Sequence, residues 1–177
     1  MRLIALAAIA AAVTAAAPAA AQFEKVDVNV SVTERNGICF IAFPRAARND
    51  TDPPRLMLEF SVRARDGNFV TSVGANNWSF ISGKDEEASL PMTLVFKGGK
   101  TTTSRSGGYS NGMEQKVWGG WGPGEGSAAA LEMLKPARSV SVRFDGQDLG
   151  EFDLQLANYA HTWLTDCVAR TKAAAGQ

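Results

Sequence analysis

The sequence is poor in the residues that build metal and cofactor sites. It contains one histidine and two cysteines among 177 residues, and the cysteines, Cys39 and Cys167, are far apart. A structural zinc site needs four ligands, which usually come in two closely spaced pairs. The sequence therefore predicts no metal site, and we expect no cofactor.

An excess of charge of either sign is also lacking, because 18 Lys and Arg balance 18 Asp and Glu. Such a surface exerts no long-range attraction on nucleic acid or anionic lipid. Beyond the N-terminal region, no apolar run is long enough to cross a bilayer. We therefore expect neither a nucleic-acid partner nor a transmembrane segment in the mature chain.

The N-terminal region has the pattern of a secretory signal peptide. Arg2 precedes an apolar run over residues 3–13, and small residues at 19–21 come before Gln22. This pattern predicts cleavage after residue 21, which leaves a periplasmic or secreted protein. An oxidising compartment favours one disulfide between Cys39 and Cys167, the alternative being two separate buried thiols.

Strand patterns dominate the rest of the chain. Valines alternate with polar residues over 26–32, and Asn36-Gly37 predicts a tight turn into the apolar run at 38–43. Similar short patterns, each bounded by Gly, Asn, Asp or Pro, predict further strands near 56–63, 69–73, 77–81 (with Trp78), 92–96, 140–144 and 152–156. This spacing indicates a single antiparallel β-sandwich domain over residues 22–172.

Two helices complete the predicted domain. Ser127 is a candidate N-cap for a short helix over 127–135, which Pro136 ends. Apolar residues recur at helical spacing over 158–172 and form one face that includes Cys167. We expect this face to pack on the sheet and residues 173–177 to form a flexible tail.

One motif suggests an enzyme. Residues 108–112 match the Gly-x-Ser-x-Gly pattern around Ser110, and a carboxylate (Asp145, Asp148 or Asp153) and then His161 follow in hydrolase order. A nucleophile elbow needs a buried strand before the serine and a helix after it. Here residues 100–106 are polar and 113–118 look extended, and a histidine in the first turn of a helix is commonly a surface residue. The hydrolase is therefore the alternative hypothesis.

The glycine-rich segment 106–126 carries Tyr109, Trp118 and Trp121, which we interpret as aromatic side chains on an adaptable loop. Such rings can stack on sugars or fill a partner's apolar pocket. The competing interpretation is that the tryptophans close an open end of the sandwich.

The order of elements from Ser127 to Cys167, together with Asn77-Trp78-Ser79 and the strand at 92–96, resembles exported alphaproteobacterial proteins. More distantly, it is similar to the invasion-associated locus B family, although that family's mid-chain cysteines are absent. The resemblance implies an envelope protein of β-sandwich type and transfers no functional residue.

These observations favour a non-catalytic envelope protein that binds or scaffolds a protein or glycan partner through Tyr109, Trp118 and Trp121. The alternatives are the serine hydrolase and a carrier that holds a small apolar ligand between the sheets.

Overall fold

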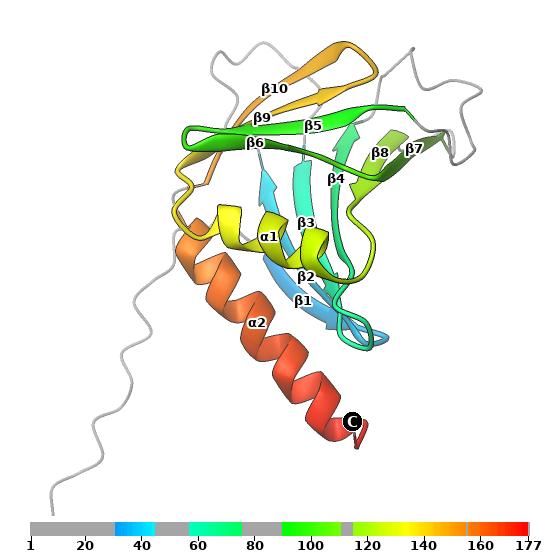
Figure 1. Ribbon diagram of the computed structural model, residues 1–177, viewed down its shortest axis with the longest axis vertical. Helices are drawn as coiled ribbons and strands as arrows, with labels where there is room; N and C mark the ends of the chain where they lie inside the picture. The colour runs from blue at the N-terminus through cyan, green and yellow to red at the C-terminus, as the bar shows by residue number, and fades with distance from the viewer. Residues whose placement is uncertain (1–30, 45–56, 76–89, 111–114, 155, 177) are drawn as a thin grey trace, which may run out of the picture.

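The computed structural model describes residues 31–44, 57–75, 90–110, 115–154 and 156–176, which form two antiparallel sheets and two helices (Figure 1). The predicted mainly-β, sandwich-like fold is confirmed. The predicted signal peptide and the strand predicted around Trp78 lie outside the described residues.

The larger sheet, sheet A, has the strand order β1-β2-β3-β4-β8-β7. Its strands are β1 (Ser31–Arg35), β2 (Ile38–Pro44), β3 (Met57–Arg63), β4 (Phe69–Ala75), β7 (Arg105–Ser110) and β8 (Gln115–Gly120). The predicted first turn is confirmed, because Asn36 and Gly37 both adopt positive φ, 54° and 75°, between β1 and β2. That geometry matches the right-handed twist of the paired strands.

The smaller sheet, sheet B, has the order β10-β9-β5-β6. It consists of β5 (Met92–Phe96), β6 (Gly99–Thr102), β9 (Ser139–Phe144) and β10 (Gln147–Asp153). In Figure 1 its strands run across one end of sheet A, and the helices follow on the same side of sheet A. The predicted Asp145-Gly146 hairpin is present, again with positive φ at both residues.

The core lies between sheet A on one side and sheet B with both helices on the other. The alternation predicted for β3 is confirmed, since Leu58, Phe60 and Val62 are all buried. The ring of Phe60 is 5.6 Å from that of Phe69, which in turn stacks on Trp121 at 5.1 Å. Aromatic packing therefore continues from the centre of sheet A to the segment that follows β8.

Helix α1 (Glu125–Leu134) begins two residues before the predicted start, so the prediction that Ser127 is its N-cap is wrong. Ser127 is a buried residue within the first turn, and its hydroxyl accepts the Phe69 N–H at 2.8 Å and donates to the Gly122 carbonyl. Serine can cap a helix, but it can also form hydrogen bonds with buried backbone groups of other segments. In this fold Ser127 does the latter, because Phe69 and Gly122 lie next to its hydroxyl.

Helix α2 (Ala157–Ala174) extends two residues into the predicted tail. Its predicted apolar face is confirmed, with Ala160, Leu164 and Cys167 buried and Trp163 packed against the core. The disulfide between Cys39 on β2 and Cys167 is formed, with the Cα atoms 6.1 Å apart. It joins sheet A to the last helix, as the buried position of Cys167 predicts.

The interpretation of residues 106–126 as an adaptable loop is wrong, because β7 and β8 pair in this segment and α1 begins at its end. One of the glycines, Gly119, serves close packing of the two sheets. A Cβ atom at Gly119 would lie 2.6 Å from both Met92 Sδ and Thr103 Cγ2. Glycine composition alone therefore suggested flexibility where the structure requires close approach.

Candidate functional site

The face of sheet A opposite the core carries an unusual number of apolar residues; we call it the outer face. In antiparallel strands, directly paired residues project to the same side, so the register assigns each position to a face. Phe40, Ser61 and Val70 form one such row across three strands, and Glu59, Ser72 and Trp118 form the next. The residues with apolar side chains on this face are half-buried or exposed, except for buried Ala42: Ile38, Phe40, Ala42, Met57, Val70 and Trp118.

Trp118 lies among positions that have no side chain. Gly107 is its direct partner on β7, and Gly120 follows it on the same face of β8. The indole is half-buried, with part of its surface facing outward. Gly107 and Gly120 are themselves buried, so the outward-facing part of the indole is the surface on which a planar ligand can stack.

A polar network adjoins Trp118 on the outer face. Lys116 Nζ is 3.5 Å from Glu59 Oε1, and the Ser72 hydroxyl donates to the same oxygen at 3.3 Å. The ion pair is only about a quarter exposed. Because these three groups come from β8, β3 and β4, their contacts independently confirm the register that places Trp118 on this face.

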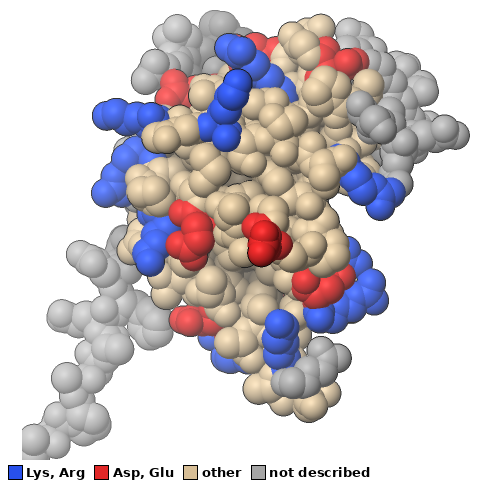
Figure 2. All heavy atoms as spheres, in the orientation of Figure 1, with Lys and Arg blue, Asp and Glu red and all other residues tan. Residues whose placement is uncertain are grey.

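Basic residues outnumber acidic ones on the outer face. The register places Arg35, Arg63, Arg105 and Lys116 there, against Glu59 alone among the described residues of the strands. The opposite side of the molecule differs, since Figure 2 shows basic and acidic side chains interspersed there, with acidic ones near the middle. A chain of zero net charge thus presents one locally basic face.

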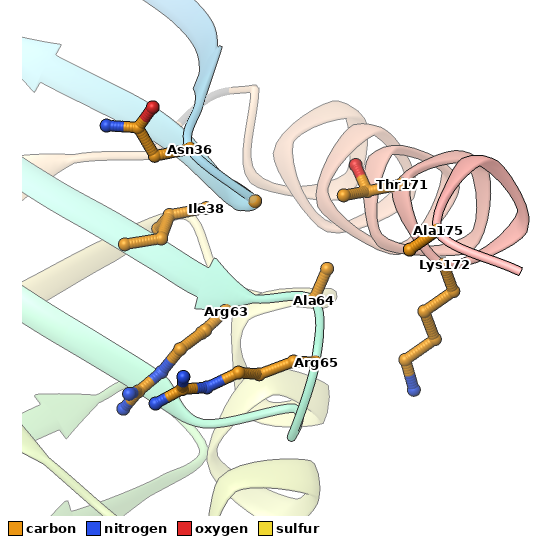
Figure 3. A pocket seen from close by; sticks show the side chains of 9 residues that line it. Asn36, Ile38, Arg63, Ala64, Arg65, Thr171, Lys172 and Ala175 are labelled. Atoms are coloured by element: carbon orange, nitrogen blue, oxygen red, sulfur yellow. The ribbon is translucent and has the colours of Figure 1, made fainter. Parts of the chain in front are cut away.

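The outer face ends at a cavity of about 340 Å³ between the β1–β2 turn, the β3–β4 turn and the last turns of α2 (Figure 3). Ile38 and Arg63 belong both to the outer face and to this cavity, and Arg65 and Lys172 add two further cations. Asp66 contacts Arg63 Nε at 3.3 Å and Arg65 Nε at 3.7 Å. Figure 3 shows the two arginine side chains extending side by side, with Lys172 on the helix side.

The three aromatic residues predicted as contacts do not lie together. Tyr109 pairs with Lys116 and Gly107 with Trp118, so positions 109 and 118 share the outer face. Trp121 instead packs against the core, and its indole N–H donates to Thr101 Oγ1 at 2.8 Å. Trp121 thus has the structural role that the competing interpretation gave to both tryptophans.

Ser110 and His161 lie on different parts of the fold. Ser110 ends the edge strand β7, whereas α2, which carries His161, packs over β2 and β3 on the far side of β4 and β8. The element after Ser110 is the strand β8, as the extended pattern at 113–118 predicts for residues 115–118. The three candidate carboxylates lie on the β9–β10 hairpin and its turn. This arrangement gives the hydrolase no support.

The interpretation of His161 as a surface residue is wrong. His161 is buried where α1 meets α2, and its Nε2 atom is 3.0 Å from Glu132 Oε1. It shares the helical face of Ala157, Ala160 and Leu164, so the spacing that defines the apolar face also included the histidine.

The carrier alternative would place an apolar ligand between the two sheets. The structure has a cavity with a mainly apolar lining, but this cavity lies elsewhere. It has a volume of about 320 Å³ and lies between the β5–β6 turn and the end of α1, next to Phe96 and Met133. Within the described ranges, no three His, Cys, Asp or Glu residues come together as a metal site. In the same part of the chain, neither helix is long and apolar enough to span a membrane.

Comparison with known proteins provides no relative, since no family model, curated protein or solved structure matches this chain. The similarity to the invasion-associated locus B family stays a prediction. Sequence reasoning identified Trp118 but missed that Phe40, Val70 and Arg63 lie on the same outer face. The alternating pattern within each strand indicates which residues lie on the same face of that strand. Only the strand order and register show which residues of different strands share one face of the sheet.

Proposed function

We propose that this protein is a non-catalytic, exported glycan-binding module, and that the outer face of sheet A is its binding surface. The observation that carries the proposal is Trp118, a half-buried indole on the outer face, flanked by glycine positions and by the Glu59–Lys116 pair. The predicted signal peptide and the disulfide support an extracytoplasmic location.

A glycan fits this face better than a protein does. The centre of a protein–protein interface is depleted of charged residues. Here an ion pair and two serines, Ser61 and Ser72, lie between the apolar residues at the middle of the face. A saccharide combines flat apolar ring faces with many hydroxyl groups, so it can use indole stacking together with the partly exposed Glu59–Lys116 pair, whereas the two serines are buried.

The test is affinity electrophoresis of the purified protein in gels that contain a polysaccharide, with Trp118→Ala compared to Tyr159→Ala. Tyr159 is a matched control because it is an aromatic residue, 45% exposed, on α2 and away from the outer face. We expect Trp118→Ala to weaken the affinity measured by the retardation by roughly two- to tenfold, because stacking of a ring on an aromatic side chain contributes about 0.5–1.5 kcal/mol. Tyr159→Ala should behave like the wild type.

Equal retardation of wild type and Trp118→Ala would contradict the proposal. If Trp118 is required only for capture of a purified envelope protein, the module binds protein and the glycan assignment is wrong.

A further inference from the structure

We propose that the ligand of the outer face is an acidic polysaccharide, whose carboxylates bind at the paired guanidinium groups of Arg63 and Arg65. This inference rests on the proposed function for the position of the ligand. It adds the chemical class of the ligand and a second contact site, at the cavity where the outer face ends.

The first argument is the local charge. Four basic residues and one acidic residue occupy the described strand positions of the outer face, although the whole chain is neutral. At the cavity, Arg65, which is 69% exposed, and Lys172 join Arg63, and these three cations outnumber two carboxylates, those of Asp66 and of Glu34, which accepts the N–H of the lining residue Gly37. A ligand with repeated negative charges is electrostatically complementary to this distribution.

The second argument is the geometry of the arginine pair. Asp66 contacts both guanidinium groups at their Nε atoms, which orients the two side chains in the same direction (Figure 3). Each Nη edge can then donate to a further oxyanion, and a guanidinium fork matches a carboxylate in two parallel hydrogen bonds. Two guanidinium groups and one carboxylate leave the cluster with a single positive charge, so an incoming anion is not repelled.

The third argument is the spacing between the two contact sites. Glu59 is in the row of Trp118, two strands away, and Arg63 lies four residues further along β3. With about 3.3 Å per residue and about 4.8 Å between strands, the backbone positions of Trp118 and Arg63 are about 16 Å apart. A ligand that contacts both must be several sugar units long, which selects a polymer rather than a monosaccharide.

The experiment measures binding of polygalacturonate, an acidic polysaccharide, and of neutral dextran by the full mature chain. The test variant is Arg63→Gln/Arg65→Gln, and Trp118→Ala reports on the proposed function. Arg138→Gln/Arg143→Gln is the matched control, because it removes the same charge from two exposed arginines before and on β9 of sheet B. Circular dichroism and thermal unfolding establish that each variant is folded.

We expect the wild type to bind polygalacturonate more tightly than dextran. Arg63→Gln/Arg65→Gln should lose roughly tenfold or more in affinity for polygalacturonate, because two charge-assisted contacts are removed. The control should stay close to the wild type, and added salt should weaken the wild-type interaction.

Equal losses in the test and control variants would overturn the arginine site, because binding would then follow total charge. Binding of dextran and polygalacturonate with equal affinity, lost in Trp118→Ala, would overturn the acidic ligand but uphold the glycan-binding function. If Trp118→Ala binds both polymers like the wild type, the proposed function itself fails.

Discussion

Trp118 and Trp121 are three residues apart in the sequence but have different surroundings. Trp121 stacks on Phe69 and donates a hydrogen bond to Thr101, whereas Trp118 lies on the outer face between glycine positions. The side chains of one short segment thus divide between the core and the proposed binding surface. The composition of the segment led us to predict that both tryptophans contact a partner. It could not show which residues of β8 and of the segment that follows it face the core.

This difference predicts that the two alanine substitutions reduce stability by different amounts. Trp121→Ala should lower the free energy of unfolding by about 2–3 kcal/mol, since it removes a stacked, partly buried ring and a hydrogen bond. Trp118→Ala should change it by about 1 kcal/mol or less. Urea unfolding of both variants measures these values. A larger loss for Trp118→Ala than for Trp121→Ala would contradict the assignment of the two rings.

The hydroxyl-rich segment after β6 also has a definite structural role. The backbone N–H of Thr103 donates to the Met92 carbonyl on sheet B, and that of Ser104 donates to the Gly120 carbonyl on sheet A. The Ser104 hydroxyl donates to Gly120 as well. This polar segment therefore joins the two sheets through hydrogen bonds.

At the scale of the elements, a buried side-chain hydrogen bond joins α1 to sheet A, in addition to the core packing of Ala130 and Leu134. Ser127 accepts the N–H of Phe69, the first residue of β4, and both residues are buried. The bond satisfies a backbone donor that starts a strand and at the same time fixes the first turn of the helix. The position of α1 thus depends on a contact between residues 58 apart in the sequence.

Substitution of Ser127 separates this role from capping. Ser127→Ala should cost about 1–3 kcal/mol of stability, because the buried N–H of Phe69 loses its acceptor. Ser127→Asp would be neutral at an N-cap, where Asp and Ser are about equally good. At the observed buried position the added carboxylate should instead destabilise the protein at least as much as alanine does. Thermal unfolding compares the two variants, and a wild-type stability for Ser127→Asp would restore the capping interpretation.

At the scale of the whole molecule, the Cys39–Cys167 disulfide connects residues 128 apart in sequence and ties α2 to β2 of sheet A. A bridge that closes most of the chain restricts the unfolded state strongly on the loop-entropy model. The link also holds the last turns of α2 beside the β1–β2 and β3–β4 turns, where the cavity with Arg63 and Arg65 lies. The disulfide therefore contributes both to stability and to the shape of the proposed site.

Replacement of both cysteines by alanine should lower the free energy of unfolding by up to about 4–5 kcal/mol. Denaturant unfolding of the wild type with and without reductant, next to the double variant, measures this contribution. Reduced wild type and the double variant should unfold at similar denaturant concentrations. No shift upon reduction would show that the bridge does not form in the folded protein.

The sequence by itself determined most of the elements, because strand alternation, positive-φ turns and the apolar helix face are local patterns. The β1–β2 turn at Asn36-Gly37, the burial of alternate residues in β3 and the apolar face of α2 all follow from such patterns. The disulfide also followed, since a predicted exported chain with two cysteines has a single possible pairing within the chain.

Only the tertiary structure decided which residues meet. The row that contains Glu59, Ser72 and Trp118 exists because β8 pairs with β4 as well as with its sequence neighbour β7, and a pairing between strands distant in sequence has no local signature. The hydrogen bond between Ser127 and Phe69 of β4 and the contact between His161 and Glu132 also join residues that are distant in sequence, and no local pattern predicts them. Long-range register, set by burial of the two sheets against each other, thus determined the outer face and the candidate site on it.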